Sequence, residues 1–199
     1  HQSPLVLISK NASRGGTEVF IYAKDKASLF ATMAAELDRR NLSIHDAQIM
    51  TSKDGYALDT FMVLDHNGDP VEDNRHQILQ EQLTTILQST ELKLATPRRT
   101  PRQLLHFNVK TQINFIPTKT GKRSLMELVA LDTPGLLARV GSAFAELGIH
   151  LHGAKITTIG ERAEDLFILT SPISGRLDDD EEQAIKALLM KKIKELSPH

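Results

Sequence analysis

The most informative segment of the chain is Asp132-Thr-Pro-Gly-Leu-Leu-Ala, because a similar segment, Asp25-Lys-Ala-Ser-Leu-Phe-Ala, lies 107 residues earlier. At the same offset, Ser43-Ile-His-Asp-Ala-Gln-Ile aligns with His150-Leu-His-Gly-Ala-Lys-Ile. Six of the 25 aligned positions from Asp25 and Asp132 onward are identical, which is weak support by itself. The same order of secondary-structure patterns around both copies strengthens it, and together they predict an internal repeat.

Each copy opens with a strand-like run, over 18–23 and 126–131, and continues with a turn and a helix. Apolar residues recur every four positions in these helices, at Leu29, Met33 and Leu37 in the first and at Leu136, Val140 and Phe144 in the second. Thr133 is expected to cap the second of them, with Pro134 as its first residue. Asn41 and Gly148 are expected to end the two helices in a left-handed conformation.

A hairpin and a second helix complete each copy. The hairpin strands are predicted over 43–51 and 56–64, and over 150–159 and 163–171, with an Asp54-Gly55 turn in the first copy. The closing helices carry apolar stripes made of Ile78, Leu79, Leu83, Ile86 and Leu87, and of Ile185, Leu188, Leu189, Ile193 and Leu196. The acidic run that begins at Asp178 suits the positive end of the last helix.

The order β-α-β-β-α, found twice, predicts an α+β fold of two ferredoxin-like sandwiches, each an antiparallel sheet with two helices on one face. Residues 1–98 are expected to form the first unit with an extra N-terminal strand, 99–123 a connector with one or two added strands, and 124–199 the second unit. Candidates for extra strands are 5–8, 104–109 and 113–116, and one upstream strand should fill the free edge of the second sheet. Both faces of the strands over 56–64 and 165–169 are apolar, so the helix-free face is expected to be covered by the other copy or by a second chain.

Composition excludes several classes of protein. The 199 residues carry 24 basic and 25 acidic side chains, which predicts no attraction to nucleic acid. There is no cysteine, so disulfides and thiolate catalysis are excluded. No apolar run reaches the length of a membrane span and no signal peptide is present, so we expect a cytoplasmic protein. The first residue is His1, which suggests a piece of a longer chain.

The segments around Asp132 resemble the ACT domain pattern, in which an Asp-x-Pro-Gly turn leads into the first helix and a Gly-Ile-His step leads into the second strand. ACT domains bind small ligands, usually amino acids, at interfaces between domains, and they pair within or between chains. The resemblance therefore implies two ACT sandwiches and a role in allosteric regulation.

The longer segments 37–49 and 151–167 are similar to the C-terminal tandem ACT region of the bifunctional uridylyltransferase/uridylyl-removing enzyme family. That resemblance implies glutamine, or another amino acid, as ligand and the PII nitrogen-signalling protein as the target of the longer enzyme. The nucleotidyltransferase and phosphodiesterase-type hydrolase activities, with Mg²⁺ and UTP, are implied for catalytic domains elsewhere in that enzyme. This region itself is expected to have no catalytic residue and no cofactor.

An amino acid carries a carboxylate and an ammonium group, and the residues offer partners for both. The amides at a helix N-terminus suit the carboxylate, Gly135 permits close approach, and Asp132 suits the ammonium. His150 is expected to face Asp132 within the second copy, as Ser43 would face Asp25 in the first. The expected ligand-binding residues are Asp132, Gly135, Leu136, Leu137, His150 and His152, with Asp25, Ser28, Leu29, Ser43 and His45 in the first copy.

Other interpretations of the same residues remain open. Asp-x-Pro-Gly is also a good turn and helix start with no ligand, and the first copy lacks Pro-Gly. His150 and His152 share one side of a strand but lack a third metal ligand nearby in the sequence, while His45 and His152 could serve packing. The alternative function is a free-standing tandem ACT regulator that acts through protein partners. A catalytic ferredoxin-like domain is disfavoured, because no nucleophile, base and oxyanion partner cluster in the sequence.

Overall fold

The computed structural model describes residues 3–11, 15–89, 100–117, 121–173 and 175–195. The first repeat consists of β1 (Leu5–Asn11), β2 (Gly16–Lys24), α1 (Leu29–Arg39), β3 (Ser43–Gln48), β4 (Tyr56–Leu64) and α2 (Asp73–Gln88). A 3₁₀-helix, η1 (Arg102–His106), follows. The second repeat consists of β5 (Gln112–Ile116), β6 (Ser124–Leu131), α3 (Leu136–Glu146), β7 (His150–Lys155), β8 (Thr158–Ile159), β9 (Arg162–Thr170) and α4 (Asp179–Lys194).

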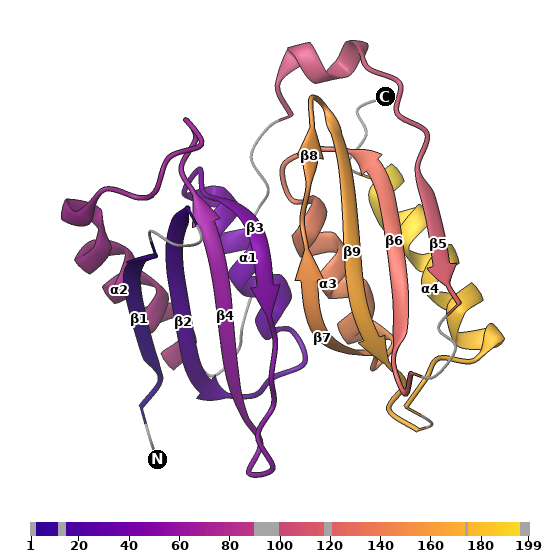
Figure 1. The fold of residues 1–199 in the computed structure, drawn as a ribbon, viewed down its shortest axis with the longest axis horizontal. Coiled ribbons are helices and arrows are strands. Elements are labelled where there is room, and N and C mark those ends of the chain that lie inside the picture. The colour runs from indigo at the N-terminus through magenta and orange to yellow at the C-terminus, as the bar shows by residue number, and fades with distance from the viewer. Residues whose placement is uncertain (1–2, 12–14, 90–99, 118–120, 174, 196–199) are drawn as a thin grey trace.

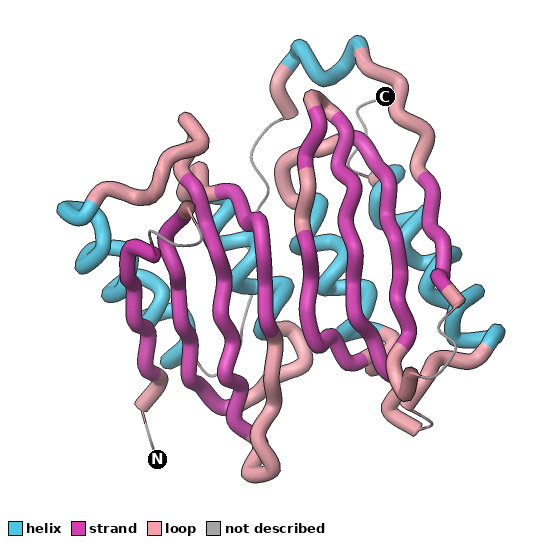
Figure 2. Tube along the Cα trace, viewed as in Figure 1, coloured by secondary structure: helices cyan, strands magenta, loops and turns pink. Residues whose placement is uncertain are grey.

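The strands of the described residues form one nine-stranded sheet in the order β1-β2-β4-β3-β7-β9-β6-β5, with β8 paired to β9. Figure 1 shows the two halves of the sheet side by side, and Figure 2 shows the α-helices together on one face, with η1 beyond the end of the strands. The two halves of the strand order mirror each other about the β3–β7 pair. The prediction of an α+β fold with two ferredoxin-like units is confirmed.

The outer edges of the sheet are formed by the strands that precede each repeat. β1 pairs with β2, and β5 pairs with β6 through the register Ile113↔Leu128. An upstream strand therefore fills the edge of the second half, as the sequence indicated. The prediction of a strand over 104–109 is wrong, because η1 occupies its first part, and β1 already covers the edge that such a strand would need. The predicted domain boundary at 98/99 lies outside the described residues.

The helix-facing side of the sheet carries the core. The stripes of α1 and α3 are buried, with Met33, Leu37 and Val140 fully inaccessible. Only one line of each closing helix is buried, at Leu79, Leu83 and Leu87 in α2 and at Ile185, Leu189 and Ile193 in α4. Ile78, which the sequence placed in the stripe, is 57% exposed, because α2 covers the edge of the sheet with a single face. Leu196 lies outside the described residues.

The two repeats meet at a seam, which we define as the β3–β7 strand pair together with the α1–α3 helix pair. The strands are antiparallel, with Ala47 opposite Ala154. Behind them, α1 and α3 are so close that a Cβ atom on Gly141 would lie 2.6 Å from Phe30 Cδ1. The copies thus join edge to edge, and the expectation that one copy covers the helix-free face of the other is wrong. Cover by a second chain stays a prediction.

Candidate functional site

Two cavities lie along the seam, and each is built from both repeats. The large seam pocket, about 350 Å³, lies between the first turn of α3 and the part of the first repeat where α1 ends and β3 begins. The small seam pocket, about 230 Å³, lies between the first turn of α1 and the part of the second repeat where α3 ends and β7 begins. The larger volume falls within the range of small-molecule sites in proteins. The two pockets are related by the same approximate symmetry as the repeats.

The turn before α3 leaves backbone amides available at the large seam pocket. Gly135 is the N-cap with φ of 83°, a left-handed conformation that favours glycine. The Leu136 amide donates to the Thr133 carbonyl oxygen at 3.1 Å. That amide is therefore already used. No side chain caps the helix and its first turn has no acidic residue, so the remaining amides of the first turn can receive an anion. The predicted cap at Thr133 is wrong by two residues, because the left-handed Gly135 delays the helix.

Asp132 places a carboxylate beside those amides. Its Oδ2 accepts a hydrogen bond from Thr158 Oγ1 at 3.1 Å, and its own amide donates to the Glu161 carbonyl oxygen at 2.9 Å. Burial raises the pKa of Asp132, and the charge of Asp38 raises it further, while the Thr158 hydrogen bond and the nearby His45 lower it. An ammonium group bound here would favour the ionised carboxylate.

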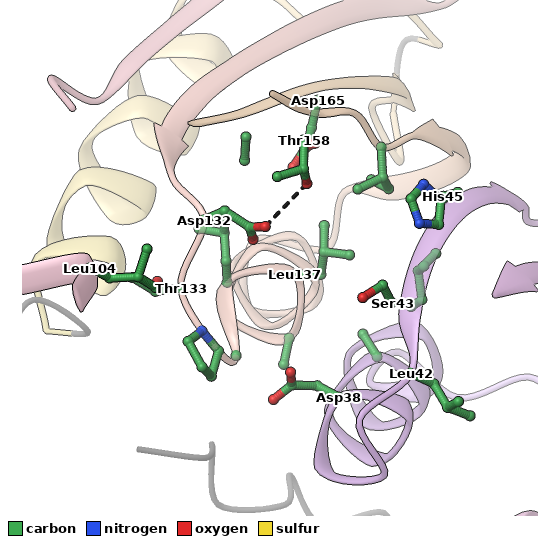
Figure 3. A pocket seen from close by; sticks show the side chains of 18 of the residues that line it. Asp38, Leu42, Ser43, His45, Leu104, Asp132, Thr133, Leu137, Thr158 and Asp165 are labelled. Carbon is green, nitrogen blue, oxygen red and sulfur yellow. Dashed lines mark hydrogen bonds between the residues drawn. The ribbon is translucent and has the colours of Figure 1, made fainter. Parts of the chain in front are cut away.

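The first repeat supplies the opposite wall of the large seam pocket. Figure 3 shows Ser43 and His45 facing the side that carries Asp132 and Leu137. Burial lowers the pKa of His45 and Lys155 lowers it further, against the opposing effect of Asp132, so the environment favours the neutral imidazole. Leu104 of η1 also lines this pocket, so the connector contributes to it.

The small seam pocket repeats the same plan with weaker features. Thr51 Oγ1 donates to Asp25 Oδ2 at 2.8 Å, and the Leu29 amide donates to the Lys26 carbonyl oxygen at 2.9 Å. Ser28 stands where α3 has Gly135, and it makes no capping hydrogen bond. His150 provides the polar side chain of the facing strand.

The ACT domain family model matches residues 124–189, the segment that holds the turn, α3 and the facing hairpin. The chain contains an ACT domain. Its first repeat has the same fold, so the seam joins the ACT domain to a second unit of the same architecture.

Curated relatives extend the comparison to nearly the whole chain. The bifunctional uridylyltransferase/uridylyl-removing enzyme of Aliivibrio fischeri (strain MJ11) is 64% identical over 98% of this chain and 22% of its own length. The enzyme of the same name from Vibrio cholerae serotype O1 is 63% identical over the same shares. That of Vibrio vulnificus (strain YJ016) is 58% identical over 99% of this chain and 23% of its own length. The chain thus spans about a fifth of the length of these relatives.

The structure divides the predicted ligand-binding residues between the two pockets in a different way from the prediction. Asp132 and His150 do not face each other, because the antiparallel β3–β7 pair brings the start of each strand against the helix turn of the other repeat. The predicted pairing within one copy is therefore wrong. The large seam pocket is lined by Asp132, Gly135, Leu136, Leu137, Ser43 and His45, and the small one by Asp25, Leu29 and His150.

Two predicted residues lie outside the linings of both pockets. His152 is hydrogen-bonded through Nε2 to Thr170 Oγ1 at 2.8 Å, and Ser28 is the N-cap of α1. Within the described ranges, no three His, Asp or Glu side chains are grouped so that they could hold a metal ion, and no helix is long and apolar enough to span a membrane.

Sequence reasoning missed the acidic residue in the last strand of each hairpin. Asp165 lines the large seam pocket and Asp59 the small one, and each side chain is 1% exposed. Burial, with a small contribution from the neighbouring Asp132 or Asp25, raises the pKa of both carboxyls to about 7. The repeated Asp-x-Phe in Asp59-Thr-Phe and Asp165-Leu-Phe was the available signal, since an acid at the same place in two apolar strands needs an explanation.

Proposed function

We propose that this chain is a regulatory region that senses a free amino acid, and that the large seam pocket is its principal site. The supporting observation is that one cavity combines uncapped helix amides with a carboxylate, Asp132, at the junction of two repeats. The amides would hold the ligand carboxylate and Asp132 its ammonium. The small seam pocket, with Ser28 in place of Gly135, is a weaker second site.

Binding at this place has a direct route to regulation. The ligand would contact the first turn of α3 in one repeat and the start of β3 in the other. It would therefore favour the arrangement in which the seam is closed over one in which the repeats move apart. An attached domain that senses this difference would have its activity coupled to ligand concentration.

Glutamine is the ligand we propose, and a uridylyltransferase/uridylyl-removing enzyme is the protein that this region would control. The support is the similarity of nearly the whole chain to enzymes of that name. In this proposal glutamine favours removal of UMP from the PII protein, and the catalytic domains, with Mg²⁺ and UTP, lie outside this region. Among the described residues, no group of His, Asp or Glu side chains fits a metal site for Mg²⁺. The same similarity favours this reading over a free-standing regulator.

Calorimetry of the 199-residue chain tests the proposal. We expect heat of binding with L-glutamine at millimolar concentration or below, and weaker binding of L-glutamate and L-serine. Asp132→Asn should weaken glutamine binding at least about tenfold, since a charge-assisted hydrogen bond contributes on the order of 1.5–3 kcal/mol. The matched control is Asp25→Asn, which changes the small seam pocket and should leave the stronger binding event unchanged. No binding of glutamine by the folded chain would contradict the proposal.

A further inference from the structure

The large seam pocket contains a polar group that the binding scheme above does not use. Asp165 lies on β9 between the buried Ala163 and Phe167, on the helix side of the sheet. Its Oδ1 accepts a long hydrogen bond from the Thr157 amide, at 3.3 Å. Its Oδ2 is buried and has no hydrogen-bond partner within the described part of the chain. A buried acceptor without a partner is costly, so such a group calls for an explanation.

The equivalent residue of the other repeat has the same property. Asp59 on β4 lines the small seam pocket, and its Oδ1 is also buried without a partner among the described residues. Two repeats that share six of 25 aligned positions have thus both placed an unpaired carboxyl oxygen at the wall of a cavity. Because the same feature occurs at both pockets, we connect the unpaired oxygen with the pockets and not with a packing defect in one repeat.

Within the described part of the chain, no side chain that lines the large seam pocket donates a hydrogen bond to Asp165 Oδ2. The Thr158 hydroxyl is already donated to Asp132. His45 is on the opposite wall, and the remaining acidic residues of the lining, Asp38 and Asp132, offer no proton donor when ionised. A molecule that fills the cavity can therefore supply the missing donor to the ionised Asp165.

We propose that Asp165 selects the side chain of the bound amino acid by accepting a hydrogen bond from a terminal primary amide. This inference rests on the proposed function, because it places an amino acid in the large seam pocket. Asp132 and the amides of α3 would hold the two groups common to all amino acids. Asp165 would supply the discrimination, since a side-chain carboxylate would meet Asp165, Asp132 and Asp38 with a like charge.

The protonation of Asp165 explains why a neutral amide suits it better than an ammonium group. Burial and the charge of Asp132 raise its pKa to about 7, so near neutral pH both forms are present. A primary amide donates to the ionised form and both donates to and accepts from the protonated form. An ammonium group has no acceptor and matches only the ionised form.

The test compares four amino acids by calorimetry on the full 199-residue chain at pH 7: L-glutamine, L-glutamate, L-methionine and L-ornithine. Methionine has nearly the length of glutamine without a donor, and ornithine offers an ammonium group. We expect the wild-type chain to prefer glutamine over each of the others by at least about tenfold. Asp165→Asn should reduce the preference for glutamine over glutamate by about tenfold, because its amide can donate to a carboxylate.

Asp54→Asn is the control, because it changes an exposed carboxyl outside the linings of both pockets and should leave these ratios intact. If wild-type chain binds none of the four, the proposed function fails and this inference with it. If glutamine binds but folded Asp165→Asn keeps every ratio within about twofold, the assignment of Asp165 is overturned while the sensor role stands. If Asp165→Asn does not fold, the affinities of the wild-type chain test the assignment. Equal binding of glutamine and methionine overturns it, and a tenfold preference for glutamine over methionine supports it.

Discussion

Asp59 and Asp165 are carboxyl groups held in an apolar layer, and their protonation links the stability of the chain to pH. Each has a pKa of about 7 in the folded chain and 3.8 as a reference value. The folded state therefore binds more protons than the unfolded state between these values. The stabilising contribution is fully present below pH 3.8 and is lost as pH rises through about 7.

The first prediction follows from that linkage. Asp165→Asn removes the titration, so its free energy of unfolding should gain on wild type by about 2.5 kcal/mol as pH rises from 5 to 8. Asp59→Asn should behave alike, and the exposed Asp54→Asn should not. Urea unfolding of the three variants and wild type at four pH values measures this. Parallel pH profiles for Asp165→Asn and wild type would show that the buried carboxyl titrates normally.

At the scale of elements, α1 and α3 cross closely at Gly141. Gly141 on α3 would place a Cβ 2.6 Å from Phe30 Cδ1 and 3.1 Å from Ala31 Cα. The Ala31 contact is with backbone, which moves only if the whole helix moves. The equivalent residue on α1 is Ala34, so the two helices differ at this position and only α3 has a glycine there.

Gly141→Ala therefore has two opposing effects on the stability of the chain. Alanine is favoured over glycine inside a helix by roughly 1 kcal/mol. Overpacking at a rigid contact costs typically about 1–3 kcal/mol, and here it displaces one helix from the other. We expect net destabilisation by about 1 kcal/mol and weaker amino-acid binding, since Gly141 also lines the small seam pocket. Thermal unfolding measures it, with the neighbouring Ser142→Ala as control. If the Gly141→Ala chain is more stable than wild type, α1 and α3 can move apart at little cost, and the expected overpacking is contradicted.

The sequence predicted the elements better than their assembly, for a physical reason. Asn41 and Gly148 do end their helices in the left-handed conformation, with φ of 58° and 68°, because that signal is local. The acidic run that begins at Asp178 does lie at the start of α4, where Asp178 also forms a capping box with Glu181 that was not predicted. The predicted pairing of Asp132 with His150 is wrong, because at the seam the start of β3 or β7 lies against the helix turn of the other repeat. No sequence pattern within one copy indicates how the two repeats join. Asp165 was missed because its unpaired oxygen is a property of the packed state.

At the scale of the whole molecule, two backbone hydrogen bonds hold the repeats together beside the strand pair. The Ile49 amide donates to the His152 carbonyl oxygen at 3.0 Å, and the Ile156 amide donates to the His45 carbonyl oxygen at 3.1 Å. Both bonds cross the seam, and each lies next to one of the pockets, whose linings include Ile49 or Ile156. Separation of the repeats breaks both together, and it would also release a ligand from either pocket.

Hydrogen exchange of these amides therefore measures whether the ligand clamps the seam. At a ligand concentration of 100 Kd, a state that must lose the ligand to open is disfavoured by about 2.7 kcal/mol, so exchange should slow by about a hundredfold. We expect this at Ile49 and Ile156 alike, even if only the large seam pocket is filled, because one opening exposes both. The control is the Val71 amide, which donates to Thr17 Oγ1 at 2.8 Å within the first repeat. Its exchange rate through local opening should not change when the ligand is added. Slowing confined to Ile156 would mean that the two hydrogen bonds open separately and that the ligand closes only its own end of the seam. The signal would then have to leave through α3 alone.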